Sequence, residues 1–346
     1  MKKQLLFLVM AFFALIFSTA YGQTAFDPPT CTATALSPAP GLQYNYQVTV
    51  SGPGYAGTGN YRWYVTSDVN LITGAVIPND GSLFNASGAG SYNLGTGGAG
   101  TIDITWASAA LTGGPYYLVI RYQETNSTAT PACDGMNIKV YRIIPINTFW
   151  LRIESAADAA GTAGGVEQCA ANVSSAVVTE PAGTVEYLYG QNVLYVKITA
   201  SGYTGNWDPI LRISNGMADQ TIDAAGITWT SGASSGTFTC SGVCTNGNGD
   251  YTSNNQMPST NAGTEIVVTI PINNNHHQAV ADQTFAVAID GSFTVGATVY
   301  NDRSDVNGNC TDGLPFEDTV NKIILARPTV NAVAPNTFAP DPLTQP

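Results

Sequence analysis

The segment from 302 to 313 gathers more side-chain oxygens than any other part of this sequence. It reads DRSDVNGNCTDG, and Asp302, Asp305, Asn307 and Asn309 place carboxylate and amide oxygens at short spacing. Calcium takes about six to eight oxygen ligands at flexible distances, and such a loop can supply several of them. The pattern departs from an EF-hand, because its glycine comes early and no Glu stands at the twelfth position. Two interpretations therefore stay open: a calcium-binding loop, and a Gly/Asn/Asp turn that binds nothing.

No other cluster of residues predicts chemistry. His276 and His277 are adjacent in the stretch NNNHHQ, which is typical of a turn between strands. The sequence has no Gly-x-Ser-x-Gly elbow, no His-Glu-x-x-His motif and no phosphate-binding glycine loop. We therefore predict that the protein is not an enzyme and has no cofactor other than calcium.

Three aromatic residues are candidate contact residues. Tyr55, Tyr203 and Trp207 lie in Gly-rich stretches, where their rings can be exposed. Exposed rings stack on sugars or pack against another subunit. The alternative is packing at the edge of the protein's own core.

The chain begins like an exported protein. Lys2 and Lys3 precede an unbroken apolar run of 13 residues from Leu5 to Phe17, and small residues follow up to Gly22. This order is typical of a secretory signal peptide, and the run is shorter than the roughly 18–20 residues that span a bilayer. We predict a signal peptide over residues 1–22 and a secreted, extracellular or cell-surface protein with no membrane span after its removal.

The composition narrows the class of protein. The 346 residues carry 12 Lys+Arg and 24 Asp+Glu, for a formal net charge of −12. An acidic balance argues against nucleic acid, because phosphate contacts need Lys and Arg. Charged residues make up 10%, against about 25% in an average domain. Since 44% of the residues are hydrophobic, the chain can still build packed cores.

Alternating large and polar residues predict strands over 44–50, 61–66, 101–106 and 116–122. Gly, Pro, Asn and Asp separate these runs. The stretch ESAADAAG at 154–161 is the single candidate helix, of one or two turns. Short strands divided by turn residues predict an all-β sandwich fold.

The two halves of the chain share landmarks in the same order. The matching pairs are VTVSGPGY at 48–55 with VKITASGY at 196–203, Ile-Thr-Trp at 104–106 with 227–229, and KVYRIIP at 139–145 with KIILARP at 322–328. We predict an internal duplication of immunoglobulin-like β-sandwich domains over 23–146 and 147–328, the second enlarged by an insertion. A Pro-rich tail over 329–346 follows, because prolines every few residues favour extended chain.

The six cysteines follow the order of this repeat. In an exported chain we expect them to be oxidised. The repeat and the short spacing of the last pair predict the disulfides Cys31–Cys133, Cys169–Cys310 and Cys240–Cys244.

The first half contains YRWYV at 61–65, GTIDITW at 100–106 and Cys133 before its last strand. These features resemble the PKD-like, immunoglobulin-like modules of secreted and surface proteins of Bacteroidota. The second half keeps the Thr-Trp pair and a late Cys. The resemblance implies modules used in adhesin stalks, filaments and surface spacers. Asp318-Thr319-Val320 also resembles the O-glycosylation sequon of that phylum, which makes Thr319 a candidate glycan site.

We therefore expect a non-enzymatic extracellular structural protein, an adhesin or filament subunit of the bacterial cell surface. Its partners would be other copies of itself or other surface proteins, joined through strand edges and the extended tail. The alternative is a carbohydrate-binding module, stabilised by calcium, whose partner is a polysaccharide.

Overall fold

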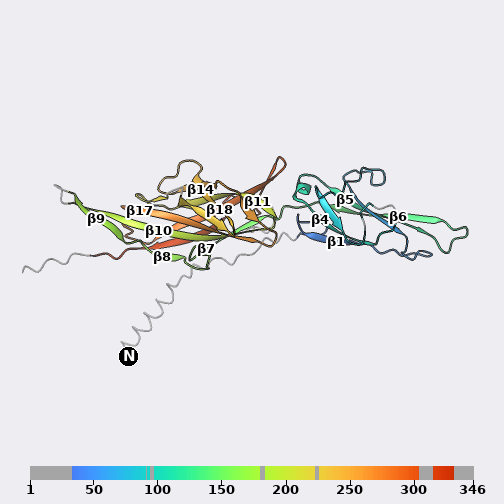
Figure 1. The fold of residues 1–346 in the computed structure, drawn as a ribbon, viewed down its shortest axis with the longest axis horizontal. Helices are drawn as coiled ribbons and strands as arrows, with labels where there is room; N and C mark the ends of the chain where they lie inside the picture. Colours follow the sequence, from blue (N-terminus) through green and yellow to red (C-terminus); the bar gives the residue numbers. More distant parts are fainter. Residues whose placement is uncertain are drawn as a thin grey trace, which may run out of the picture.

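The computed structural model of the chain describes two β domains in succession. The described residues are 33–90, 92–93, 97–179, 184–222, 226–303 and 315–330. The predicted signal peptide and most of the predicted tail lie outside them. Domain 1 (33–146) and domain 2 (147–330) follow one another along the long axis of the molecule (Figure 1). Among the described residues, no helix has the length and apolar character needed to cross a membrane.

Domain 1 is a sandwich of two three-stranded antiparallel sheets. One sheet has the order β1 (Gln43–Gln47), β4 (Thr101–Trp106), β3 (Phe84–Ser87), and the other β2 (Asn60–Thr66), β5 (Tyr116–Thr125), β6 (Asp134–Ile143). Trp63 and Trp106 are fully buried between them, because alternate residues of each strand face inward. A 3₁₀ turn, η1 (Ser108–Thr112), follows β4, and its Leu111 packs against the core of domain 2.

Domain 2 is built from one long path of hydrogen-bonded strands that encloses its own core. The path runs β7-β10-β17-β13-β14-β15-β11-β18-β20-β8, with β9, β12, β16 and β19 paired to it. The strands are β7 (Trp150–Ala156), β8 (Glu167–Cys169), β9 (Val173–Thr179), β10 (Thr184–Ser201), β11 (Gly205–Ser214), β12 (Thr221–Ile222), β13 (Thr228–Ser231), β14 (Ser234–Cys240), β15 (Gly249–Ser253), β16 (Met257–Ser259), β17 (Thr264–Asn275), β18 (Gln283–Val295), β19 (Thr298–Asn301) and β20 (Asp318–Leu325). Its buried cluster begins at Phe149, whereas that of domain 1 ends at Ile143.

The predicted all-β class and tandem sandwich domains are confirmed, and the predicted helix at 154–161 is wrong. Its first residues belong to β7, which pairs with β10, and Ile153 and Ser155 alternate inward toward the core. A turn follows, closed by Asp158 Oδ1, which accepts hydrogen bonds from the backbone N–H groups of Ala160 and Thr162. The apolar spacing that suggested a helix is the alternation of a half-buried strand.

The predicted duplication is not confirmed by the pairing of the strands. In domain 1, β4 lies between β1 and β3, whereas β13, its counterpart by sequence, lies between β14 and β17. The tryptophans of the two landmarks, Trp106 and Trp229, are nevertheless both buried in their cores.

A hydrogen bond joins the two domains directly, and two more hold the first residues of domain 2 in place. Asn261 Nδ2 of domain 2 donates to the carbonyl of Pro40 in domain 1 over 3.0 Å. In the connecting segment, Asn147 Nδ2 donates to the carbonyl of Asn301 at 2.7 Å, and Arg303 Nε donates to the carbonyl of Asn147 at 3.1 Å. We infer that the joint is a packed contact, which holds the two domains in line.

The joint depends on glycine at position 202, between β10 and β11. Gly202 has a φ of +75°, a conformation that other residues rarely adopt, and its carbonyl accepts a 2.6 Å hydrogen bond from Thr148 Oγ1. A Cβ atom at this position would lie 1.8 Å from the carbonyl oxygen of Thr148. No side chain fits there without moving the connecting segment.

We expect Gly202→Ala to loosen the joint, because the new Cβ must displace the backbone of Thr148. Small-angle X-ray scattering should show a broader distribution of long distances, with a melting temperature lower by a few degrees, as strain of about 1–3 kcal/mol implies. Gly232→Ala is the matched control, since Gly232 has a φ of +56° and nothing within 4 Å of its Cβ position. Identical scattering from the two variants would contradict the prediction.

Candidate interaction surfaces

The three predicted aromatic contact residues do not share one environment. Trp207 is fully buried, so the prediction that it is exposed is wrong. It lies on β11 at an inward position of the alternation, and its Nε1 donates to the carbonyl of Pro258 over 3.3 Å. Tyr203 is half-buried and stacks on Phe293 at 3.9 Å between ring centroids. Tyr55 lines a surface hollow.

That hollow belongs to a groove at the seam between the two sheets of domain 1, which we call the seam groove. One wall is 48–51, which continues from β1, and the other is 135–139 of β6. Ile120 and Tyr122 of β5 lie between the walls. Two adjoining hollows of about 200 and 230 Å³ make up the groove. It exists because β1 and β6 are the outer strands of their sheets and do not pair with each other.

Glu124 holds the chain that follows the first wall of the seam groove. Its carboxylate accepts hydrogen bonds from the Tyr122 hydroxyl, from the N–H groups of Ala56 and Gly57, and from Thr58 Oγ1. These bonds, led by that of Tyr122, lower the pKa of Glu124 to about 2. The segment beside the groove is therefore fixed to β5.

A hairpin with exposed apolar side chains projects from domain 2. It consists of β9 and the first residues of β10, at 173–179 and 184–188, and we call these residues the arm. Val177 and Val178 are 57% and 53% exposed, and Val185, Tyr187 and Leu188 are also exposed. Beyond residue 188, β10 joins β17 and becomes part of the main sheet.

Arg327 fastens the base of the arm to the end of β20. Its guanidinium lies 3.7 Å above the Tyr189 ring and donates to the carbonyls of Ala171 and His277, each at 2.8 Å. His276 Nδ1 is hydrogen bonded to the carbonyl of Tyr187 at 3.0 Å. The two histidines, predicted to lie in a turn, thus follow the end of β17 beside the arm.

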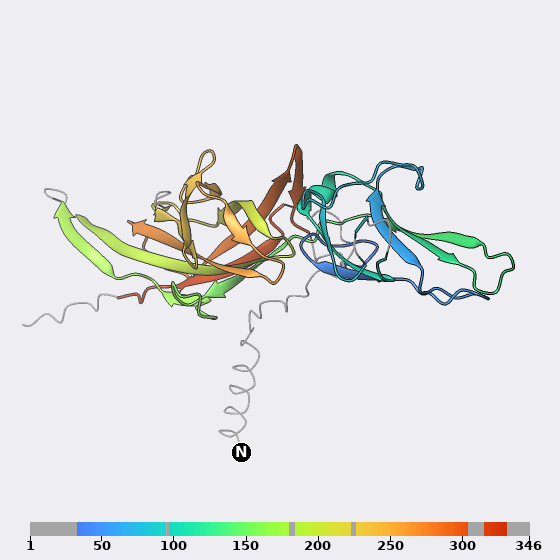
Figure 2. The same cartoon turned by 45° about the vertical axis from the view of Figure 1, so that its right-hand side comes forward.

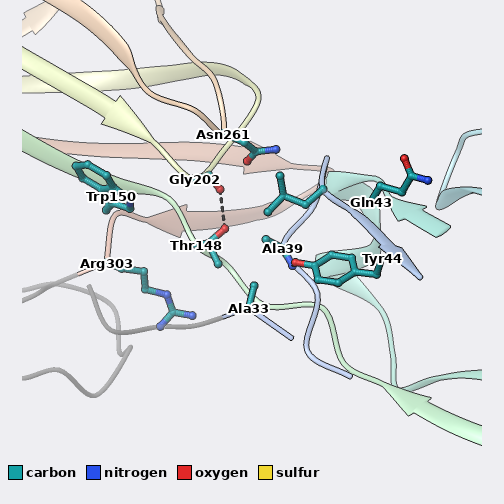
Figure 3. Close-up of a pocket in the computed structure, with 10 residues that line it drawn as sticks. Ala33, Ala39, Gln43, Tyr44, Thr148, Trp150, Gly202, Asn261 and Arg303 are labelled. Atoms are coloured by element: carbon teal, nitrogen blue, oxygen red, sulfur yellow. Dashed lines mark hydrogen bonds between the residues drawn. The ribbon is translucent and has the colours of Figure 1, made fainter. Parts of the chain in front are cut away.

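A hollow of about 450 Å³ lies at the joint between the domains (Figure 3). Tyr44 and Ala39 line it from domain 1, and Trp150, Asn261 and Arg303 from domain 2. Arg303 is the single charged side chain of the lining, and its Nε already donates to the backbone. We interpret the hollow as part of the joint.

Asp302, the first of the predicted calcium ligands, is buried and not in a solvated loop. It is 4% exposed directly after β19, and its Oδ1 accepts a 3.3 Å hydrogen bond from the N–H of Gly291. Burial, followed by repulsion from Asp290 and Asp318, raises the pKa of Asp302 far above its ordinary value of about 4. Burial therefore favours the protonated form of the Asp302 side chain.

The other predicted ligands, Asp305, Asn307 and Asn309, lie outside the described residues. Within the described ranges, no three His, Cys, Asp or Glu side chains gather in a metal-binding geometry. The calcium site therefore stays a prediction.

The disulfide Cys240–Cys244 is present, as predicted. Cys133 and Cys169 are exposed, while their predicted partners, Cys31 and Cys310, lie outside the described residues, so these two pairings stay predictions.

Thr319 is exposed at the start of β20, and its hydroxyl donates to the carbonyl of Phe316 over 3.2 Å. A glycan at this position likewise stays a prediction.

No protein-family model and no curated protein matches this chain. Among solved structures, it is similar to the collagen-binding domain of a Staphylococcus aureus adhesin, at 10% identity over 41% of this chain and 99% of that one, with a TM-score of 0.20. It is also similar to the full-length major pilin SpaD of Corynebacterium diphtheriae, at 10% identity over 81% and 62% of the two chains, with a TM-score of 0.26. A structure described by pH-induced modulation of adhesion by Streptococcus parasanguinis Fap1 fimbriae matches at 10% identity over 51% and 94%, with a TM-score of 0.23. Since TM-scores this low carry no functional argument, the function proposed below rests on the surfaces of this chain.

We expect Asp302→Asn to stabilise domain 2 at alkaline pH. The folded pKa of Asp302 is raised, so the free energy of unfolding is largest below about pH 4 and falls as the pH rises toward the folded pKa. Asparagine cannot ionise in the unfolded chain and keeps a hydrogen-bond donor for Asp290, which should give a gain on the order of 2 kcal/mol at pH 8. Urea unfolding from pH 4 to 8 measures it, with the exposed Asp208→Asn as control. Equal pH dependence in wild type and Asp302→Asn would disprove this account.

Proposed function

We propose that this chain is a non-enzymatic structural protein of the bacterial surface, a filament or adhesin subunit that assembles with copies of itself. In this proposal, the sandwich domains are modules of the PKD-like, Bacteroidota type, exported by the signal peptide. The observation that carries it is a two-domain rod, held in line by the joint, with unpaired strand edges near both ends.

Unpaired strand edges support assembly, because their free N–H and C=O groups can pair with another chain. Soluble proteins commonly guard such edges with charged side chains, especially Lys. This chain has 12 Lys and Arg in 346 residues, and β9 contains neither. The arm is therefore an edge without the usual protection.

The Pro-rich tail supports the same proposal. The chain leaves domain 2 after β20, where Arg327 packs on Tyr189 at the base of the arm. A segment that continues from this point can reach a neighbouring copy in extended conformation. The tail would add contact area to an assembly made by the arm.

We expect the mature chain, residues 23–346, to form linear polymers whose length rises with concentration, seen by electron microscopy and sedimentation velocity. Deleting 329–346 should raise the concentration needed for half-assembly about tenfold, which corresponds to about 1.4 kcal/mol. A chain that stays monomeric at every concentration would overturn the proposed function. If the deletion leaves the half-assembly concentration unchanged, the tail takes no part in assembly.

Calcium stabilisation is a second candidate property, favoured by the buried Asp302 and the partly exposed Asp290 near the predicted loop. A bound cation would stabilise the ionised form of the Asp302 carboxylate. Sugar binding is not proposed, since the buried Trp207 cannot offer its ring to a ligand.

Millimolar calcium is expected to raise the melting temperature of the wild-type chain by roughly 5 °C, and chelation to reverse this. The Asp302→Asn variant should lose the shift, because its amide carries no charge. Differential scanning calorimetry with calcium, magnesium or chelator is the measurement. An equal rise in melting temperature in the variant would mean that calcium binds away from Asp302. No rise in the wild type would rule out stabilisation by calcium.

A further inference from the structure

The arm and the seam groove lie toward opposite ends of the molecule. Figures 1 and 2 place β9 at one end of the long axis and the hairpin of β5 and β6 at the other. A contact between two unlike patches at opposite ends cannot close within a pair of copies. Repeated from copy to copy, it generates an open chain.

One face of the arm is apolar. Val178 lies opposite Val185 and Ala176 opposite Tyr187, and since these pairs are two residues apart they share a face. Val178, Val185 and Tyr187 are 53%, 45% and 40% exposed. Among the described strands, β9 pairs with β10 alone, so its outer edge is free along its whole length.

The seam groove has the complementary character. Among the described strands, β6 pairs with β5 alone and presents a free outer edge to the groove. Val48, Val50 and Ile138 line the walls, and Ile120 and Tyr122 lie between them. A strand laid in the groove can pair with the edge of β6 and rest apolar side chains on the partly exposed Val48, Val50 and Ile138, which is the geometry of β-strand addition.

Charge selects the arm of a second copy as the occupant. Domain 1 has five acidic and four basic residues, whereas domain 2 has seventeen and six. Lys139 lines the seam groove, and Arg62, Arg121 and Arg142 lie on the same sheet. The arm carries Glu186, whose side chain is 60% exposed. The Lys-lined groove in the less acidic domain of one copy therefore suits the arm of the next, which carries Glu186 in the more acidic domain.

We propose that the arm of one copy lies in the seam groove of the next, with β9 added to the free edge of β6 and Glu186 close to Lys139. The inference rests on the proposed self-assembly and names the contact that carries it. The contact links copies head to tail, and each copy uses one end as donor and the other as acceptor.

The test uses two full-length mature variants, each blocked at one end. Val178→Asp with Val185→Asp places charge on the exposed face of the arm, while Ser51→Trp fills the groove from an exposed position shared by both hollows. Matched controls are Val69→Asp, at a site 87% exposed, and Ser82→Trp, at an exposed serine outside the groove.

We expect each blocked variant to be monomeric, by sedimentation velocity, at concentrations where the wild type and both controls polymerise. Mixed in equal amounts, the two blocked variants should form dimers and nothing longer, because one free arm and one free groove remain. Polymers of either blocked variant, or a mixture that stays monomeric, would overturn the contact while leaving the proposed function standing. A wild type that never assembles would overturn both.

A charge exchange tests the pairing of the two strands. Lys139→Glu and Glu186→Lys should each raise the half-assembly concentration roughly fivefold, and the double variant should return it to within about twofold of wild type. Circular dichroism checks that all three variants are folded. If the two single increases in half-assembly concentration simply multiply in the double variant, these side chains do not contact each other.

Discussion

The contact between the carbonyl of Thr148 and Gly202 sets the arrangement on which the rest of the molecule depends. With no Cβ at position 202, the connecting segment approaches the turn between β10 and β11 closely enough for the Thr148 hydroxyl to bond there. Asn147 and Arg303 then fix the connecting segment to the end of β19, and Asn261 bonds to domain 1. Because the joint is packed, the arm and the seam groove stay at opposite ends of the molecule. A flexible linker would let their relative position vary.

Because the chain has few charged residues, the arm and the seam groove carry few charged side chains. A typical sheet edge is protected by Lys or Glu, but in the arm Val178 faces Val185 across the two strands. The few charges that exist are used inside as well as outside. Lys322 is buried and donates to Ser155 and to backbone carbonyls, and burial lowers its pKa to about 8. Asp302 is also buried, and this burial raises its pKa.

Much of the fold follows from local patterns, and the errors have a common cause. Alternation placed β2, β4 and β5 correctly, because a strand with one buried face repeats every two residues. The same alternation in β7 looked like a short helix, since the small residues of ESAADAAG suit either structure. Trp207 was assigned to a Gly-rich turn, yet the strand begins at Gly205 and turns the ring inward. Local composition cannot tell which side of a strand meets the core.

The sequence by itself determined an acidic, charge-poor chain with a predicted export signal, strands in two successive domains and a Cys240–Cys244 loop. These features follow from the composition, from the two-residue periodicity of strands and from the short spacing of the two cysteines. All of these can be read from residues that are close together in the sequence. Tertiary structure alone decided that no described strand pairs with the outer edges of β6 and β9, that Trp207 and Asp302 are buried, and that the arm and the seam groove lie at opposite ends. Each depends on contacts between residues far apart in the chain, and a strand's sequence does not encode which of its edges will find a partner.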